Sequence, residues 1–187
     1  MVSRILPGLV GALTLAGAGM AVAQEEESTN RVAAETDWSV FVEDDPQECW
    51  AVTQPKETVN TRDGRVVAVR RGEILLFTFY RPSDDVAGQV TFTGGYPFST
   101  EVPITMVVGD DRFRLYTQPD DPDTPVNEQE WAWAASAEED AEIAAAMRRG
   151  VDAVITAEST RGTTTEDTFS LMGYTAAVEE AEARCDE

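Results

Sequence analysis

The sequence of 187 residues contains no histidine and only one lysine, Lys56. Without an imidazole, the chain cannot form a Ser-His-Asp or Cys-His catalytic site, a histidine-ligated metal site or a histidine proton shuttle. Lys56 is the one candidate for Schiff-base or P-loop chemistry, and no glycine-rich phosphate loop accompanies it. The net charge of -21 disfavours nucleic acid as a partner, because binding its phosphates requires a concentrated basic surface.

The first 23 residues are organised like a secretory signal peptide. Residues 1–4 form a short n-region with the basic Arg4, residues 5–20 are mostly apolar, and residues 21–23 form an A-x-A cleavage site. We therefore expect cleavage between Ala23 and Gln24. The mature protein would be periplasmic, secreted or associated with the outer membrane, and would have no transmembrane segment. The alternative is a membrane anchor, because the apolar stretch is nearly long enough to span a bilayer.

Only two cysteines are present, Cys49 and Cys185. In an exported protein, two such cysteines favour one structural disulfide over a redox or metal site. A helix near the second cysteine would have a buried face made of Tyr174, Val178, Ala181 and Cys185. We therefore predict a disulfide between Cys49 and Cys185 that attaches the last helix to the first hairpin.

Apolar periodicity divides the mature chain into a flexible acidic leader at 24–36 and a single β-rich domain at 37–187. Alternating apolar residues between turn-forming Gly, Pro and Asp predict strands, and segment 118–130 is expected to be a loop. The predicted strands are 38–42, 49–53, 65–70, 74–80, 90–92, 102–108, 112–117, 151–158 and 163–171.

Two helices are predicted, at 137–149 and at about 175–184. Ser136 and Glu139 form a capping box before the first helix, and basic residues followed by Gly150 are typical of its end. The elements together indicate a mainly β fold with two short helices near the C-terminus. Periodicity leaves two architectures open for the strands, an antiparallel β-sandwich and a small barrel-like sheet.

Several short segments occur in the order found in one known family of proteins. They are 37–40, 48–50, 54–56, 94–98, 112–115, 131–133, 146–150, 159–163 and 169–174. Behind a signal peptide, these segments make residues 37 to 185 resemble the invasion-associated locus B family of exported alphaproteobacterial proteins. The resemblance implies a periplasmic or surface-associated β-rich domain with a role in host-cell invasion or in the envelope. It implies no enzymatic activity general to the family.

Adjacent acidic residues occur at 44–45, 84–85, 110–111 and 120–121. Paired carboxylates hydrolyse glycosides when they face each other across a cleft, so a periplasmic hydrolase is the alternative function. Acids in turns are more typical of a solvated surface, and no other catalytic motif is present. The acidic segment at 120–128 offers oxygen atoms for calcium but lacks the glycine of an EF-hand loop. We predict no catalytic residue, no cofactor and no metal.

Aromatic residues and one arginine mark the best candidate for an interaction surface. Two tryptophans at 131 and 133 would point the same way on an extended strand, although packing in the core or at an edge also explains them. The selected residues are Trp131, Trp133, Tyr96 and Arg161. The sequence therefore predicts an exported, non-catalytic binding or interaction module with an unknown protein or envelope partner.

Overall fold

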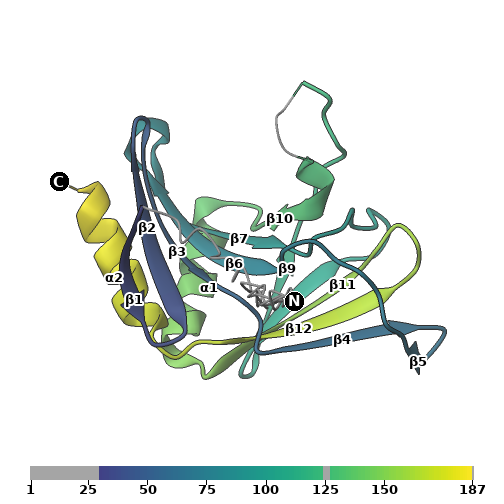
Figure 1. The fold of residues 1–187 in the computed structure, drawn as a ribbon. Coiled ribbons are helices and arrows are strands. Elements are labelled where there is room, and N and C mark those ends of the chain that lie inside the picture. Colours follow the sequence, from purple (N-terminus) through teal and green to yellow (C-terminus); the bar gives the residue numbers. More distant parts are fainter. Residues whose placement is uncertain (1–29, 124–126, 187) are drawn as a thin grey trace, which may run out of the picture.

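The structure is a computed structural model that describes residues 30–123 and 127–186. Its strands form two six-stranded antiparallel sheets (Figure 1). The first sheet has the strand order β1-β2-β3-β6-β7-β10. Its strands are β1 (Arg31–Glu35), β2 (Trp38–Asp44), β3 (Gln47–Thr53), β6 (Leu75–Arg81), β7 (Val86–Thr93) and β10 (Trp131–Trp133).

The second sheet has the strand order β5-β4-β12-β11-β8-β9. Its strands are β4 (Glu57–Arg62), β5 (Arg65–Val66), β8 (Ile104–Val108), β9 (Asp111–Leu115), β11 (Asp152–Glu158) and β12 (Thr164–Ser170). Neither sheet closes into a barrel within the described chain. The predicted mainly β, antiparallel fold is therefore confirmed. Of the two architectures left open, the strands form two separate sheets and not a barrel-like sheet.

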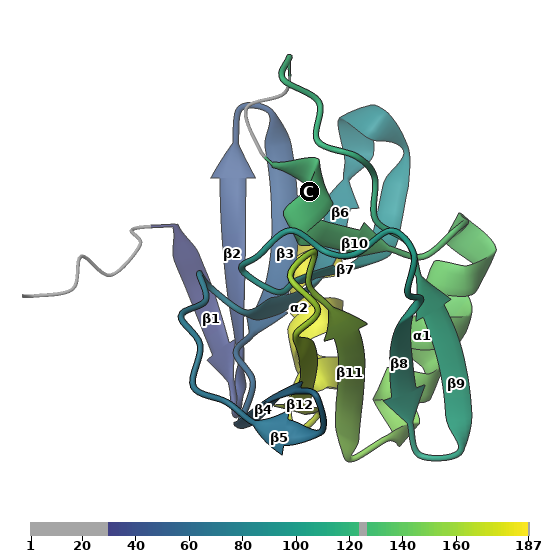
Figure 2. The same cartoon turned by 90° about the vertical axis from the view of Figure 1, so that its right-hand side faces the viewer.

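Two helices, α1 (Ala137–Arg149) and α2 (Tyr174–Cys185), pack against the first sheet. The Ser136 hydroxyl accepts a hydrogen bond from the Glu139 N–H, so the predicted N-cap of α1 is confirmed. Figure 1 shows α2, in yellow, alongside β1, β2 and β3. In the turned view of Figure 2, α2 lies behind β11 and α1 lies behind β8. The helices thus cover the face of the first sheet that also meets the second sheet.

One continuous hydrophobic cluster joins the helix-covered face of the first sheet to the inner face of the second. Alternate strand residues supply it, including Val40 and Ala51 from the first sheet and Ile155 from the second. The rings of Phe92 on β7 and Phe169 on β12 meet edge to face, with centroids 6.0 Å apart. This contact joins the two sheets directly.

Cys49 on β3 and Cys185 at the end of α2 form a disulfide, as predicted. The predicted buried face of α2 is also confirmed, because Tyr174, Val178, Ala181 and Cys185 are all buried. The Tyr174 ring lies 4.9 Å from that of Trp38 on β2. The bond and the ring contact attach the last helix to the first hairpin.

Several elements differ from the prediction. Segment 24–36 was expected to be a flexible leader, yet Arg31–Glu35 forms β1 and pairs with β2. Backbone pairing orders this strand while most of its side chains stay exposed, so its sequence shows little apolar pattern. For the same reason the exposed strand β4 was not predicted. The strand predicted at 65–70 is limited to Arg65–Val66, because the apolar residues that follow are mostly exposed and do not continue the strand pairing.

The expected signal peptide at 1–23, with Ala23 and Gln24, lies outside the described residues. Cleavage between Ala23 and Gln24 therefore stays a prediction. Within 30–123 and 127–186, no helix combines the length and the apolar character needed to cross a bilayer.

Candidate functional site

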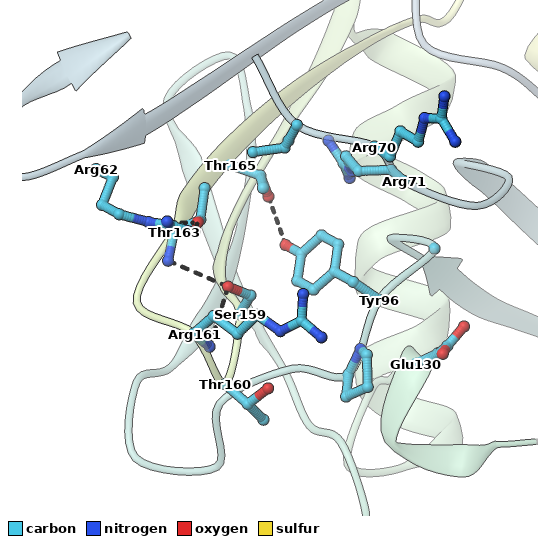
Figure 3. Close-up of a pocket in the computed structure, with 13 residues that line it drawn as sticks. Arg62, Arg70, Arg71, Tyr96, Glu130, Ser159, Thr160, Arg161, Thr163 and Thr165 are labelled. Atoms are coloured by element: carbon cyan, nitrogen blue, oxygen red, sulfur yellow. Dashed lines mark hydrogen bonds between the residues drawn. The ribbon is translucent and has the colours of Figure 1, made fainter. Parts of the chain in front are cut away.

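A cavity of about 250 Å³ opens where loops of the two sheets meet. Its walls come from β4, the segment between β5 and β6, the turn after β7 and the turn between β11 and β12. Four arginines line it, namely Arg62, Arg70, Arg71 and Arg161 (Figure 3). We call this cavity the arginine pocket. A cluster of cations is unexpected in so acidic a chain, so its position is informative.

Arg71 is held by a buried ion pair with Asp167 on β12. Its side chain is 5% exposed and that of Asp167 is 0% exposed. The Arg71 Nη1 and Nη2 atoms donate to the two carboxylate oxygens at 2.7 and 2.6 Å, and Nε donates to the Gly94 carbonyl at 2.9 Å. The Thr58 hydroxyl adds a third bond to Asp167 at 3.1 Å. This bidentate geometry fixes the segment before β6 against the second sheet.

Tyr96 forms an aromatic wall of the pocket. Its hydroxyl shares a 2.6 Å hydrogen bond with the Thr165 hydroxyl on β12. The Arg71 guanidinium lies 5.0 Å from the ring centroid, within range of a cation–π interaction. Burial disfavours the phenolate and is the main reason that the pKa of Tyr96 rises to about 12. Tyr96 therefore stays neutral at physiological pH, and its ring is fixed from two sides.

Two glycines allow the loops that carry Tyr96 and Arg71 to touch. The Gly72 N–H donates to the Gly95 carbonyl at 2.9 Å. Gly95 has a φ of +68°, and a Cβ atom there would lie 2.6 Å from the Gly72 backbone. Only glycine therefore fits at position 95 without moving the opposite loop.

The turn between β11 and β12 presents Arg161 to the pocket. The Ser159 hydroxyl oxygen accepts the backbone N–H groups of Arg161 and Thr163, at 3.3 and 3.1 Å. The Arg62 guanidinium on β4 donates to the Thr163 hydroxyl on the other side of the turn. Figure 3 shows the Arg161 side chain reaching beneath the Tyr96 ring, whereas Arg70 turns outward at the rim.

Positive charge exceeds negative charge in the arginine pocket. The guanidinium groups of Arg70 and Arg161 have no hydrogen-bond or ion-pair partner within the described part of the chain. Arg62 donates only to a neutral hydroxyl. Glu130 is the one carboxylate among the described lining residues. The arrangement can therefore bind an anion, because guanidinium groups match the geometry of carboxylates, sulfates and phosphates.

The structure separates the four residues that the sequence selected. Tyr96 and Arg161 meet in the arginine pocket. Trp131 and Trp133 lie on β10, on either side of the buried Ala132, and thus share one face of the strand. The backbones of Trp133 and Tyr116 exchange two hydrogen bonds, at 2.8 and 2.9 Å. The four residues that were expected to form one interaction surface therefore belong to two separate surfaces.

Trp131 belongs to a row of aromatic rings on the face of the first sheet away from the helices. Phe41 stacks on Trp50 at 5.6 Å, and Trp50 lies 6.2 Å from Phe79. Phe77 continues the row and lies 5.6 Å from Trp131. A cavity of about 880 Å³ adjoins Phe41, Trp50 and Phe77, with charges of both signs in its lining. That mixed lining specifies no ligand class, so the arginine pocket is the stronger candidate site.

The acidic pairs proposed for a hydrolase do not lie in the arginine pocket. The pairs at 44–45, 84–85, 110–111 and 120–121 are exposed and lie in or beside turns and loops. Within residues 30–123 and 127–186, no three His, Cys, Asp or Glu side chains are grouped closely enough to hold a metal ion. Residues 124–126 of the acidic segment lie outside the described residues.

Arg62, Arg71 and Asp167 are site residues that were not selected from the sequence. The sequence pattern could have indicated Asp167, because this residue occupies an inward position on β12 between the buried residues Thr165 and Phe169. A carboxylate at a core-facing position requires a buried partner, which in a chain without histidine and with one lysine is most readily an arginine. Which arginine reaches it depends on the tertiary fold.

No protein-family profile and no curated protein sequence match this chain. Its fold is similar to the crystal structure of invasion associated protein B from Bartonella henselae. The TM-score is 0.54, and the match covers 83% of this chain and 98% of that chain at 15% sequence identity. At this identity the similarity establishes a structural relationship. The resemblance found in the sequence is thereby supported at the level of the fold.

Proposed function

We propose that this protein is an exported, non-catalytic binding module of the bacterial cell envelope that recognises oxyanions in the arginine pocket. The observation that carries the proposal is the Arg161 guanidinium, which enters the pocket without a partner among the described residues. The surrounding loops are fixed by the Arg71–Asp167 ion pair and by the Gly72–Gly95 contact. Such a preorganised site loses little conformational entropy on binding an anion.

The envelope assignment is supported by two features. The disulfide between Cys49 and Cys185 is typical of proteins that fold in an oxidising compartment. The fold is shared with invasion associated protein B, and a role in host-cell invasion or in envelope function is part of the proposal.

The chemistry of the pocket supports binding over catalysis. Its buried hydroxyls, those of Ser159, Thr163 and Thr165, all have hydrogen-bond partners already. Activating a hydroxyl nucleophile requires an adjacent base, and the chain has no histidine to act as one.

The binding function is tested by thermal unfolding in sodium sulfate, with ionic strength held constant by sodium chloride. Sulfate should raise the Tm of the wild-type protein, because a ligand that binds only the folded state stabilises it. The Arg161→Ala variant should lose this increase. The matched control is Arg149→Ala, which removes an exposed arginine that lies 3.5 Å from Asp111 outside the pocket. Equal responses of the two variants would refute the assignment of the site.

Export is tested separately by expressing the full chain in a Gram-negative host and fractionating the cells. We expect periplasmic protein whose first residue is Gln24. Protein retained in the cytoplasm with residues 1–23 intact would contradict the envelope assignment and leave the anion site untouched.

A further inference from the structure

The charge balance of the arginine pocket indicates what charge its ligand carries. The pocket has four guanidinium groups, with that of Arg70 at the rim, and two carboxylates, Glu130 in the lining and Asp167 behind Arg71, which leaves an excess of two positive charges. Both oxygens of Asp167 are occupied by Arg71, so this carboxylate is not available to the other arginines. A ligand with two negative charges would neutralise the excess, whereas a single carboxylate would leave half of it.

The directions of the donors indicate the shape of the ligand. Arg161 enters from the turn between β11 and β12, and Arg62 enters from β4. Hydroxyl groups from Ser159, Thr160 and Thr163 line the wall between them. A carboxylate presents two oxygens in one plane, whereas a phosphate group on an ester presents three acceptor oxygens in different directions. Donors that surround the cavity therefore suit the tetrahedral group better.

The cavity also has an apolar wall beside the donors. The Tyr96 ring, Val69 and Pro97 contribute to it, and none of them carries a charge. Inorganic phosphate would leave this surface unused, whereas the organic part of an ester can pack on it.

On the basis of the proposed function, we infer that the ligand of the arginine pocket is the dianionic group of a phosphomonoester. The site would distinguish the dianion from the monoanion because the second negative charge neutralises the rest of the positive excess of the pocket. Since a phosphate ester loses its second proton near pH 6, its affinity should rise over the pH range in which that proton is lost.

Few groups of the protein itself interfere with this test. The charged or titratable side chains that line the cavity are the four arginines, Glu130 and Tyr96, and Asp167 lies behind Arg71. Glu158 and Glu166 lie on the adjoining strands β11 and β12 and do not line it. Histidine, the side chain that ordinarily titrates between pH 6 and pH 8, is absent from the sequence.

The experiment measures the Kd values of glucose 6-phosphate, inorganic phosphate and sulfate by isothermal titration calorimetry at pH 5.0 and pH 7.5, at constant ionic strength. The affinity for glucose 6-phosphate should rise about tenfold from pH 5.0 to pH 7.5, in proportion to its dianion. Sulfate is a dianion at both values, so its affinity should stay constant and thereby control for changes in the protein. The ester should bind more tightly than inorganic phosphate at pH 7.5.

The possible failures are distinguishable. If sulfate binds and the ester shows no rise relative to sulfate, the dianion inference is wrong while the oxyanion site stands. If inorganic phosphate binds more tightly than glucose 6-phosphate, the ester is not the ligand. If no oxyanion binds, or if Arg161→Ala binds like Arg149→Ala, both the inference and the proposed function fail.

Discussion

The helix-covered end of the molecule and the arginine pocket differ in whether their polar groups have hydrogen-bond or ion-pair partners. At the helix-covered end, which comprises α2, β2, β3 and the Cys49–Cys185 disulfide, the buried polar side-chain atoms of the described residues are hydrogen-bonded. The Trp38 indole N–H donates to the Ser170 carbonyl at 3.0 Å, and the Thr78 and Tyr174 hydroxyls lie 3.2 Å apart. In the arginine pocket, two guanidinium groups have no partner within the described chain.

We therefore expect the helix-covered end to contribute mainly to stability and the arginine pocket mainly to binding. Paired buried groups and a disulfide contribute to the free energy of unfolding, whereas unpaired cations at a cavity add little to it and attract anions. Asp167 contributes to both properties, because its side chain is fully buried and is paired with Arg71, which lines the pocket. Substitutions in the two regions should therefore affect different measurements.

The largest expected effect is on stability, from the double substitution Cys49→Ser with Cys185→Ser. The two cysteines are 136 positions apart, and a loop of this size corresponds to a loss of about 5 kcal/mol in the free energy of unfolding. Urea denaturation measures the loss. Sulfate affinity of the folded variant should stay within about twofold of wild type, because the bond lies outside the pocket. A large loss of affinity in the folded variant would mean that the two regions are not separable.

Asp167→Asn should lower the free energy of unfolding by about 3 kcal/mol, because it leaves the buried Arg71 charge without its partner. The control is Lys56→Ala, which removes an exposed ion pair with Asp152 and should cost less than about 1 kcal/mol. Similar urea midpoints for the two variants would contradict the structural role of Asp167.

Tyr96→Phe should have a smaller effect, about 1 kcal/mol, because it removes the hydrogen bond to Thr165 and keeps the ring. The matched control is Tyr116→Phe. Tyr116 directly follows the last residue of β9, its side chain is exposed, and the Arg114 guanidinium lies over its ring. Denaturation curves that overlay for wild type and Tyr96→Phe would show that the hydroxyl does not stabilise the pocket.

The smallest effect is expected at Asp140, a buried carboxylate on α1 that accepts the Val90 N–H at 2.8 Å. Burial is the main reason that its pKa is raised. The folded state therefore keeps the proton longer than the unfolded state, and stability falls as the pH rises from the ordinary aspartate pKa through the raised value. Asn keeps an oxygen acceptor and cannot ionise.

The stability of Asp140→Asn relative to wild type should therefore increase between pH 3 and pH 6. Thermal unfolding across this range measures the difference, with the exposed substitution Asp110→Asn as control. A relative stability that falls with rising pH would mean that the ionised carboxylate is stabilised in the fold.

The sequence predicted those features that depend on local patterns. The capping box at Ser136 marked α1, and the apolar face of α2 placed Cys185 toward Cys49. The strands β1 and β4 were not predicted, because backbone pairing orders them with little apolar burial. The opposite error occurs at β5, where apolar residues predicted a strand at 65–70 but only two residues pair.

The candidate site could be predicted only in part. Tyr96 and Arg161 were selected from the sequence together with Trp131 and Trp133, but only the first two line the arginine pocket. Arg71 and Asp167 are 96 positions apart, and no local periodicity links residues at that distance. Long-range contacts of this kind are specified by the packing of the two sheets, which the order of strands along the chain does not reveal.

The most direct test of the oxyanion site is an NMR titration of the isotope-labelled protein with sodium sulfate at constant ionic strength. We predict saturable shifts of the backbone amides of 159–163 and of Tyr96, together with the Arg161 side-chain Nε–H, while amides of α2 stay unchanged. Shifts that fail to saturate, or that centre on Arg148 and Arg149 at the end of α1, would contradict the assignment of the arginine pocket as the binding site.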